Sequence, residues 1–297
     1  MTTTSGLLLV DKPAGLTSHD VVTRLRAIFL ERRIGHAGTL DPMATGLLVV
    51  AIGPSTRLLR FAQAQRKRYL GTVELGVATD SLDADGAVTM TLAVPMMSVA
   101  GVNEVARTMR GAQLQVPPMV SSLKVGGRRL HALAREGVHV ERAPRDIVID
   151  SFELFATADG HHWDFDVTCS VGTYVRVLLS DLAEKLGTVG HLSALRRVES
   201  GHHHVENAHT LDELAGLDDA RSALLAPSHL VDALESTVLD GATIAKVRRG
   251  QRVALPAQFQ GEEIAALDEA GDLVGVLGRR QDSWKPEIVM VGDTGAT

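Results

Sequence analysis

The sequence predicts an α+β fold: a mixed, largely antiparallel central sheet flanked by helices and loops, followed by a small all-β unit. Strand and helix patterns are interspersed along most of the chain. From about Thr237, short β-like pieces alternate with Gly and Pro turns instead. Apolar residues make up 45% of the 297 residues, which supports a sizeable core. We therefore expect two domains, residues 1–230 and residues 231–297.

The first elements are a strand, a turn and a helix. Gly6–Val10 is a short apolar strand, and Asp11–Gly15 is a turn. Ser18 is a good N-cap residue for a helix over roughly His19–Leu30. These structural roles account for the string KPAGLTS, so we assign it no chemistry.

The stretch Gly35–Leu48, GHAGTLDPMATGLL, places one carboxylate, Asp41, on a shaped loop. Its glycines allow sharp turns and close approach of the backbone to other groups. Pro42 restricts Asp41 to an extended or turn conformation and so keeps it out of a helix. The apolar run Leu47–Ile52 predicts a buried strand directly afterwards. A single acid is therefore held on a loop that leads into the core, and such loops commonly carry chemistry.

A helix, a strand and a polar loop follow. Thr56–Gln65 is predicted to be helical, and Arg66–Ala78 alternates as a strand with Tyr69 on its apolar face. Thr79–Gly86 carries three aspartates but lacks the register and the terminal Glu of a calcium loop, so we interpret it as a polar loop. Asn103–Arg110 is a short helix.

The middle of the chain is predicted to contain a basic hairpin and two paired strands. Gln115–Gly137 begins with a Pro-Pro turn, continues through a Gly-Gly hairpin and ends in a helix. Ile147–Ala156 and Trp163–Val171 are paired strands joined by a polar turn. Cys169 lies on the apolar face of the second strand, which indicates a buried small residue and not a nucleophile.

The next predicted helix, Val175–Leu186, carries Arg176 in its first turn. A helix N-terminus is an unfavourable place for a cation, so Arg176 should have an anionic partner. Gly190–Val198 follows, and its Leu195 is expected in the core. Leu211–Leu234 is helical, acidic and interrupted by loops.

The net charge of −6 argues mildly against nucleic-acid binding, but the charge is unevenly distributed. Residues 200–240 hold eight acids and one base, a net charge of −7, which leaves +1 for the rest of the chain. In that remainder the bases form pairs or triplets: Arg32-Arg33, Arg66-Lys67-Arg68, Arg128-Arg129, Arg196-Arg197, Arg248-Arg249 and Arg279-Arg280. Such clusters are able to form a phosphate-binding face despite an acidic total. Any single pair taken alone is better explained as a solvated surface charge.

Several classes of protein are disfavoured. The one cysteine, Cys169, excludes an internal disulfide and a cysteine-based zinc site. Three adjacent histidines, His202–His204, cannot easily all face one metal ion, so we expect a solvated segment there. The N-terminus lacks the pattern of a signal peptide, and no apolar run has the length of a membrane helix. We expect a cytoplasmic protein without a metal.

The Asp41 string closely resembles G-H-x-G-x-L-D-P-x-A-T-G, the catalytic motif of the TruB family of bacterial tRNA pseudouridine-55 synthases. The strings KRY at Tyr69, GTYVR at Arg176 and LRR at Leu195 resemble three more motifs of that family, in the same order. The resemblance covers roughly residues 6–200. It implies the pseudouridine synthase fold and, by position, a PUA-like RNA-binding module at the C-terminus.

The resemblance implies catalytic roles for three residues. Asp41 is the catalytic residue of the motif, and Arg176 pairs with it. Our hypothesis is that this pair keeps Asp41 ionised in a dry pocket, because a close cation favours the charged form of a carboxyl group. Tyr69 stacks on the target uracil and is a candidate relay for the proton that leaves carbon 5.

Three substrate-binding residues are implied in addition to Tyr69. Leu195 lines the uracil pocket and Tyr174 contacts the site. His36 takes the space vacated by the flipped base; a histidine hydrogen-bonded within its own loop is the equally weighted alternative.

The function implied by the resemblance is isomerisation of a uridine in the tRNA T-loop to pseudouridine, without metal or cofactor. The target base lies inside a folded loop and must be extruded first. Asp41 either attacks carbon 1′ of the sugar or withdraws its 2′ proton, and the sequence does not choose between these. The expected partner is the T-arm of tRNA. We expect a monomer with no membrane attachment and no obligate protein partner.

Two other classes of function are considered. In phosphoryl transfer, Asp41 would be the nucleophile, with Thr39 or Asp83 near a magnesium ion, but the phosphate cradle G-x-x-x-x-G-K-[ST] is absent. A T-loop-binding tRNA chaperone would extrude the base without essential catalysis. Release of tritium from tRNA labelled at uracil carbon 5 separates these alternatives from isomerisation.

Overall fold

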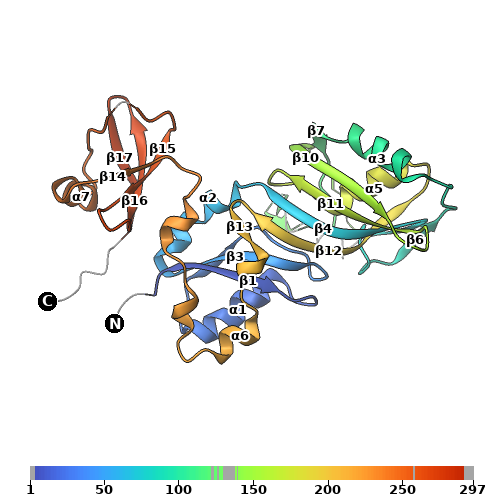
Figure 1. Cartoon of the computed structure of the whole chain (residues 1–297), viewed down its shortest axis with the longest axis horizontal. Coiled ribbons are helices and arrows are strands. Elements are labelled where there is room, and N and C mark those ends of the chain that lie inside the picture. The colour runs from blue at the N-terminus through green and yellow to red at the C-terminus, as the bar shows by residue number, and fades with distance from the viewer. Residues whose placement is uncertain are drawn as a thin grey trace. The chain divides into compact units, whose positions relative to one another are not determined.

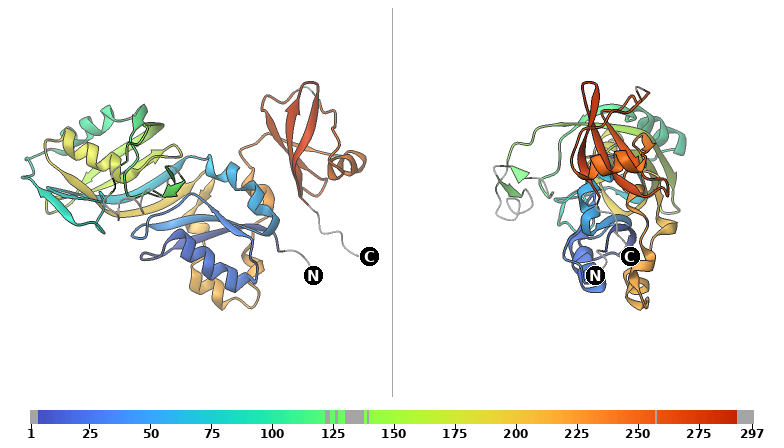
Figure 2. Two further views of the ribbon diagram at one scale, coloured as in Figure 1. Left: turned by 180° about the vertical axis from the view of Figure 1, so that it is seen from behind. Right: turned by 90° about the vertical axis from the view of Figure 1, so that its left-hand side faces the viewer.

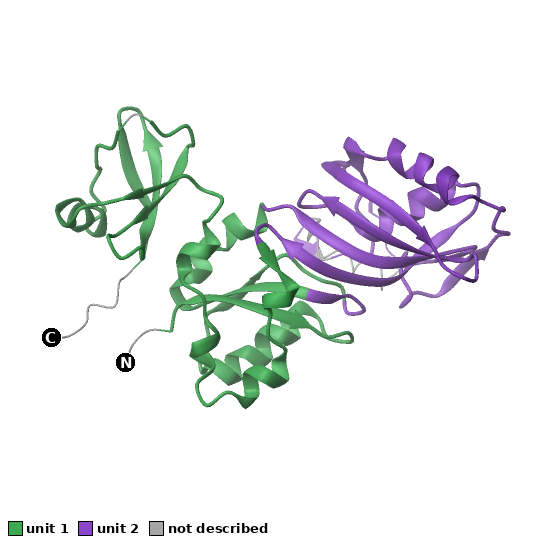
Figure 3. Cartoon of the chain, viewed as in Figure 1, with its two compact units in different colours: residues 1–41, 47–64, 203–297 green, residues 42–46, 65–202 purple. Residues whose placement is uncertain are grey.

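The computed structural model describes residues 4–121, 124–125, 127–129, 138, 140–256 and 258–290. The chain forms two compact units (Figure 3). Unit 1 comprises residues 1–41, 47–64 and 203–297, and unit 2 comprises residues 42–46 and 65–202. Strands and helices occur in both, which confirms the α+β class. The division groups the N-terminal strands with the C-terminal part, whereas the domains 1–230 and 231–297 stay a prediction.

Unit 1 is built around three strands. The first and the third were expected from apolar runs, whereas the second, Ile34–Ala37, lies largely in the stretch that we interpreted as a loop. In this part of the chain the elements are β1 (Gly6–Lys12), α1 (Ser18–Phe29), β2 (Ile34–Ala37), β3 (Thr45–Ile52), the 3-10 helix η1 (Gly53–Leu58) and α2 (Leu59–Gln63). β3 pairs with β1 on one side and with β2, in antiparallel register, on the other. The helix predicted over Thr56–Gln65 therefore begins as a 3-10 turn, with Pro54 in its first positions.

Alternating side chains of β1 divide unit 1 into two apolar cores. Leu8 and Val10 pack with the buried side of α1. Leu7 and Leu9 pack with residues that include Val276 of the C-terminal sheet. Figures 1 and 2 show α1 and α6 (Leu211–Gly216) together beside these strands.

The N-cap of α1 is Thr17, so the assignment of that role to Ser18 was wrong. The Thr17 side chain accepts a hydrogen bond from the backbone N–H of Asp20, and the Asp20 carboxylate accepts one from the backbone N–H of Thr17. This reciprocal capping box satisfies two N–H groups that the helix leaves unpaired. Ser18 is instead buried, with 2% of its surface exposed.

The C-terminal part of unit 1 carries a separate four-stranded sheet. The elements after residue 202 are β13 (His203–His204), η2 (Val205–Asn207), α6, η3 (Ala220–Ala223), η4 (Pro227–Leu230), β14 (Ser236–Val238), α7 (Gly241–Arg248), β15 (Glu263–Leu267), β16 (Leu273–Arg280) and β17 (Ser283–Val289). The sheet order is β14-β15-β16-β17. The small sheet was predicted, but α7 was not.

The unpredicted helix has a clear local cause. Asp240 caps it by accepting a hydrogen bond from the N–H of Thr243 at 2.7 Å. After α7, where we expected a further short β-like piece, Val253 forms only an isolated bridge with Trp284. We interpreted the basic residues around Lys246 as part of the all-β unit. For that reason we did not predict the helix that follows the N-cap residue Asp240.

Unit 2 is organised on an antiparallel sheet in the order β12-β4-β11-β10-β7. Its elements are β4 (Lys67–Leu75), β5 (Val77–Thr79), β6 (Val88–Thr91), α3 (Val99–Thr108), β7 (Gly111–Gln115), β8 (Lys124–Val125), β9 (Arg128–Arg129), β10 (Arg145–Ala156), β11 (His162–Cys169), α5 (Val175–Lys185) and β12 (Gly190–Ser200). The pairing predicted for the strands around Ile147–Ala156 and Trp163–Val171 is confirmed.

Helices α3 and α5 cover one face of this sheet (Figure 1). The face is formed by alternate residues such as Trp163, Phe165 and Val167, all of which are buried. Cys169 continues the same row and is 1% exposed, as predicted. Asp164, between them, points to the exposed side.

The basic segment after Gln115 contains the expected hairpin, since β8 and β9 pair in antiparallel register. The helix predicted up to Gly137 lies outside the described residues. Within the described part of the chain, no helix has both the length and the apolar character needed to cross a membrane.

Candidate active site

Asp41 lies on the loop between β2 and β3, as the sequence predicted. Gly38 turns the chain there with a φ of 92°, a value that favours glycine. Asp41 is half-buried and Pro42 is exposed. Asp41 is the last residue of the first stretch of unit 1, and Pro42 begins the first stretch of unit 2. Asp41 is thus the residue at which the chain first leaves unit 1.

The downstream end of the loop is fastened to β12 through Gly46. Gly46 has a φ of 98°, and a Cβ atom placed on it would lie 2.3 Å from the backbone oxygen of Arg197. Only glycine allows that approach. Next to it, the Thr45 hydroxyl donates a hydrogen bond to the backbone oxygen of Leu195 at 3.4 Å. The strand that carries Leu195 therefore also holds residues 45–46.

Tyr69 and Leu195 lie on one face of the unit 2 sheet. In the register of β4 and β12, Tyr69 is opposite Arg197 and Leu195 is opposite Gly71. The two side chains are therefore diagonal neighbours, within reach of each other across the strands. Both are buried, at 7% and 9% exposed. The structure brings these two predicted residues together on the sheet face that α5 covers.

Arg176 is held by a cluster of oxygen atoms that includes a buried carboxylate. It is 3% exposed in the first turn of α5, and its Nη1 lies 3.1 Å from Oδ2 of Asp83. Nη1 also donates to the backbone oxygen of Ser81 at 3.1 Å, and Nη2 donates to that of Val120 at 2.7 Å. Asp83 is therefore an anionic partner of the kind that we expected for Arg176.

Sequence reasoning missed the role of Asp83 as a partner of Arg176. Asp83 lies in the segment that we interpreted as a polar loop, yet it is 4% exposed and its Oδ1 accepts a hydrogen bond from the Ser81 hydroxyl. A buried carboxylate needs such partners. The available signal was the expected anion for Arg176 together with three aspartates in one short loop. The pairing of Arg176 with Asp41 stays a prediction.

Tyr174 directly precedes α5 and is half-buried. Its backbone N–H donates to Oε1 of Gln115 at 2.8 Å, and Nε2 of Gln115 donates back to the Tyr174 oxygen at 3.1 Å. This amide clamp fixes the start of the helix that carries Arg176. His36 is half-buried in β2, opposite Val50, and its role stays a prediction.

The sheet face beside Tyr69 also carries a buried lysine. Lys67 is 5% exposed, and burial together with the nearby Arg197 lowers its pKa to about 8. Burial raises the pKa of the opposite Cys169 thiol to about 11, which makes it a poor nucleophile. Arg68, which points to the other face, pairs with Asp166 and Glu199.

In the described ranges, no group of three or more His, Cys, Asp or Glu residues is arranged to hold a metal ion. In the histidine patch, His203 is buried, contrary to the expected solvated segment, and its Nε2 lies 3.2 Å from the backbone oxygen of His229. His202 and His204 are exposed.

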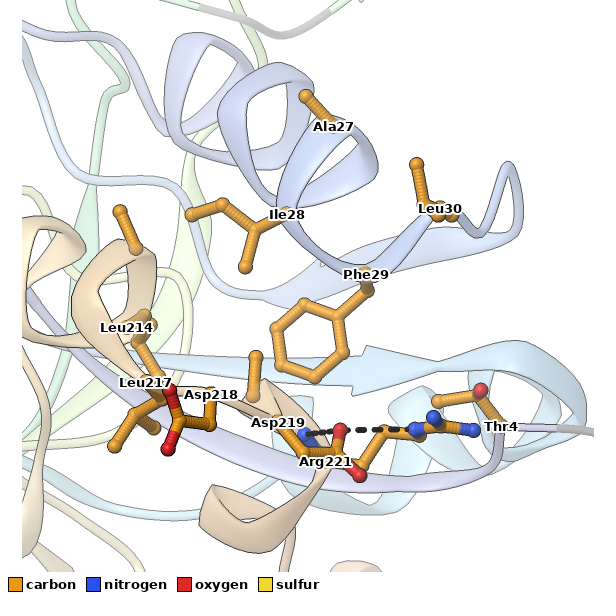
Figure 4. Close-up of a pocket in the computed structure, with 12 residues that line it drawn as sticks. Thr4, Ala27, Ile28, Phe29, Leu30, Leu214, Leu217, Asp218, Asp219 and Arg221 are labelled. Atoms are coloured by element: carbon orange, nitrogen blue, oxygen red, sulfur yellow. Dashed lines mark hydrogen bonds and ion pairs between the residues drawn. The ribbon is translucent and has the colours of Figure 1, made fainter.

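A hollow of about 700 Å³ lies on unit 1 between the end of α1 and the segment after α6 (Figure 4). Its apolar residues include Phe29, Leu30 and Leu217, and Asp219 pairs with Arg221 at its edge. None of the predicted site residues lines it. We therefore do not assign the chemistry to this hollow.

The sequence of the chain matches two family models and several named proteins. Residues 26–175 match the family described as TruB family pseudouridylate synthase (N terminal domain), and residues 176–239 match the tRNA pseudouridylate synthase B C-terminal domain. A Mycobacteroides abscessus protein named tRNA pseudouridine synthase B is 40% identical over 290 residues, which cover 96% of each chain. The protein of that name from Opitutus terrae is 48% identical over 212 residues, covering 71% of this chain and 88% of its own.

A solved structure shares the fold at lower sequence identity. It is described as an H/ACA RNP bound to a substrate RNA containing 2′-deoxyuridine. The matched chain is 22% identical with a TM-score of 0.75, and the match covers 97% of this chain and 86% of that one. At this identity the likeness supports the predicted fold and nothing further.

We predict that Asp83→Ala lowers the free energy of unfolding by about 3–5 kcal/mol, because it removes one partner of a buried ion pair. Urea denaturation measures the change. Glu104→Ala is the matched control, since it removes the partner of Arg107 in a pair whose side chains are 53% and 68% exposed. The control should lose at most about 1 kcal/mol. Equal losses in the two variants would contradict the role of burial.

A second prediction concerns the pH dependence of stability. The pKa of Lys67 is about 8 in the folded chain against 10.5 for an ordinary lysine. The folded state therefore releases this proton first, and stability rises with pH between these values. The full gain corresponds to about 3 kcal/mol.

Stability curves of the wild type and Lys67→Met isolate this effect. The wild type should gain relative to the variant between pH 7.5 and pH 9.5, with most of the gain above pH 8. Parallel curves over that range would show that the Lys67 pKa is not lowered.

Proposed function

Since the chain belongs to the TruB family of pseudouridylate synthases, we propose that it converts a uridine in the tRNA T-loop, at position 55, to pseudouridine. The relatives that carry the name tRNA pseudouridine synthase B support tRNA as the substrate. The observation that carries the proposal is the placement of Asp41 on a loop whose two ends are fixed by hydrogen bonds and by Gly46.

The reaction conserves atoms and electrons. The bond between N1 of uracil and carbon 1′ of the sugar breaks, the base turns, and carbon 5 bonds to carbon 1′. The proton on carbon 5 is lost and N1 gains one. Asp41 begins this sequence either by attacking carbon 1′ or by withdrawing the 2′ proton, and both routes need the ionised carboxylate.

In this proposal Arg176 stabilises the ionised form of Asp41, but Asp41 is not the only carboxylate with which it interacts. A guanidinium has five N–H donors, and the bonds to Asp83, Ser81 and Val120 use Nη1 and Nη2. In the proposed reaction Arg176 serves two carboxylates, Asp83 and Asp41. Asp83 holds the guanidinium in place, so its position does not depend on the substrate.

The base is bound by the face that carries Tyr69 and Leu195. A flat uracil stacks on the Tyr69 ring, and Leu195 closes the apolar side. Tyr174 contacts the bound nucleotide, and His36 fills the space that the extruded base leaves in the T-loop. Tyr69 also relays the proton from carbon 5. These assignments follow the family motifs, and the diagonal placement of Tyr69 and Leu195 supports the stacking role.

We also propose that residues 231–297 form a PUA-like domain that binds tRNA phosphates. Four exposed cations lie at the end of α7 and just beyond it: Lys246, Arg248, Arg249 and Arg252. Within the described residues their side chains form no ion pair or hydrogen bond. A cluster of exposed cations is suited to a phosphate backbone.

The remaining expectations complete the proposal. The protein acts as a monomer on the T-arm, without an obligate protein partner and without metal or cofactor. A tRNA substrate and a single buried cysteine both fit the cytoplasm.

We predict that Asp41→Asn reduces tritium release from tRNA labelled at uracil carbon 5 by at least about a thousandfold, because it keeps the side-chain shape and removes the charge. Asp212→Asn, at an exposed position of α6, is the control and should keep full activity. Substantial activity in Asp41→Asn would exclude Asp41 as the reacting acid. A wild type that binds tRNA but releases no tritium would favour the chaperone function.

The triple variant Arg248→Gln, Arg249→Gln, Arg252→Gln should bind tRNA about tenfold or more weakly at physiological salt. Its plot of log affinity against log salt should be shallower by up to about three, roughly one for each lost phosphate contact. Arg221→Gln in the acidic stretch is the control and should change neither quantity. An unchanged salt slope in the triple variant would remove this surface from the tRNA interface.

A further inference from the structure

Ser18 makes two hydrogen bonds to a residue of the Asp41 loop. Its Oγ accepts a hydrogen bond from the backbone N–H of Leu40 at 2.9 Å and lies 3.3 Å from the backbone oxygen of Leu40, to which it donates. One hydroxyl thus satisfies both backbone groups of a residue 22 positions later in the chain. The bonds are buried, since Ser18 is 2% exposed and Leu40 is 3% exposed.

The backbone of Leu40 needs such a partner. β2 ends at Ala37, so Leu40 lies beyond the strand pairing with β3. Buried N–H and C=O groups that leave a sheet ladder must be hydrogen-bonded elsewhere. The Ser18 hydroxyl makes the two hydrogen bonds to the Leu40 backbone that a neighbouring strand would otherwise make.

The bond to Leu40 fixes the backbone of Asp41. The Leu40 oxygen belongs to the peptide group that joins Leu40 to Asp41, and this group is planar. Holding the oxygen therefore orients the N–H and Cα of Asp41. On the other side, Pro42 limits the conformations of Asp41.

Ser18 is itself held rigidly. It is the first residue of α1, where its side chain is buried. The preceding turn is closed by the buried Lys12, whose Nζ donates to the backbone oxygens of Pro13 and Leu16 at 2.9 Å and 2.6 Å. Lys12 and Ser18 of the string KPAGLTS thus form a fixed support for the loop, a role that its sequence did not reveal.

We propose that Ser18 is a positioning residue that holds the Asp41 carboxylate in its reactive place through the Leu40 backbone. The inference rests on the proposed function, because it assumes that Asp41 reacts. Ser18 does not touch the substrate. Its loss should therefore slow the chemical step and leave tRNA affinity unchanged.

The test compares three variants with the wild type in single-turnover tritium release at saturating enzyme. Ser18→Ala should react about 10–100-fold more slowly, since small displacements of a reacting group cost this much. Its tRNA dissociation constant should stay within about twofold of the wild type. Ser18→Thr keeps the hydroxyl and should recover most of the rate.

Thr17→Ala is the matched control. It removes the cap of the same helix without touching Leu40, so it should lower the melting temperature but leave the rate within about twofold. Hydrogen exchange gives an independent readout: the Leu40 N–H should exchange faster in Ser18→Ala and not in Thr17→Ala. If Ser18→Ala does not fold, Ser18→Cys fills the same space with a weaker hydrogen-bonding group and should also be slow.

The outcomes separate the two proposals. A normal rate in Ser18→Ala, or an equal loss of rate in Thr17→Ala, would overturn the positioning role. A wild type without tritium release would instead overturn the proposed function, whatever the Leu40 exchange shows.

Discussion

The candidate site depends on one constraint: the loop that carries Asp41 must keep a single backbone conformation although it lies outside the sheet. Two devices impose it. Before Asp41, the Ser18 hydroxyl replaces strand pairing for Leu40. After Asp41, Gly46 allows β3 to meet the Arg197 backbone at a distance that excludes any side chain. In the proposed reaction, a carboxylate between two such fixed points loses little conformational entropy.

The electrostatics of the site are set by a second buried element, the Arg176–Asp83 pair. The Asp83 carboxylate lies 3.1 Å from the guanidinium and compensates its charge, and the backbone oxygens of Ser81 and Val120 accept hydrogen bonds from the same group. The position of Arg176 is thus fixed by contacts within unit 2. The interaction of Asp41 with this guanidinium stays a proposal.

Most strands and helices that carry the candidate site residues were predictable, because they are determined by the spacing of apolar and polar residues over short stretches of sequence. Apolar runs located β1 and β3, alternation located β4 and β11, and the order of motifs indicated Asp41, Tyr69, Arg176 and Leu195. What the sequence concealed depends on contacts between distant segments. Ser18 looked like a cap, yet its partner is Leu40; Asp83 looked like a loop acid, yet it faces Arg176. The helix α7 was missed for a local reason, because its Asp240 cap was overlooked beside a basic run.

The most direct test of the account is to find where the protein acts. An unmodified tRNA transcript would be treated with the protein, digested to fragments and analysed by mass spectrometry for the carbon–carbon glycosidic bond of pseudouridine. The account predicts one new pseudouridine per tRNA, at position 55 in the T-loop. No pseudouridine, or pseudouridine formed only elsewhere in the tRNA, would contradict it.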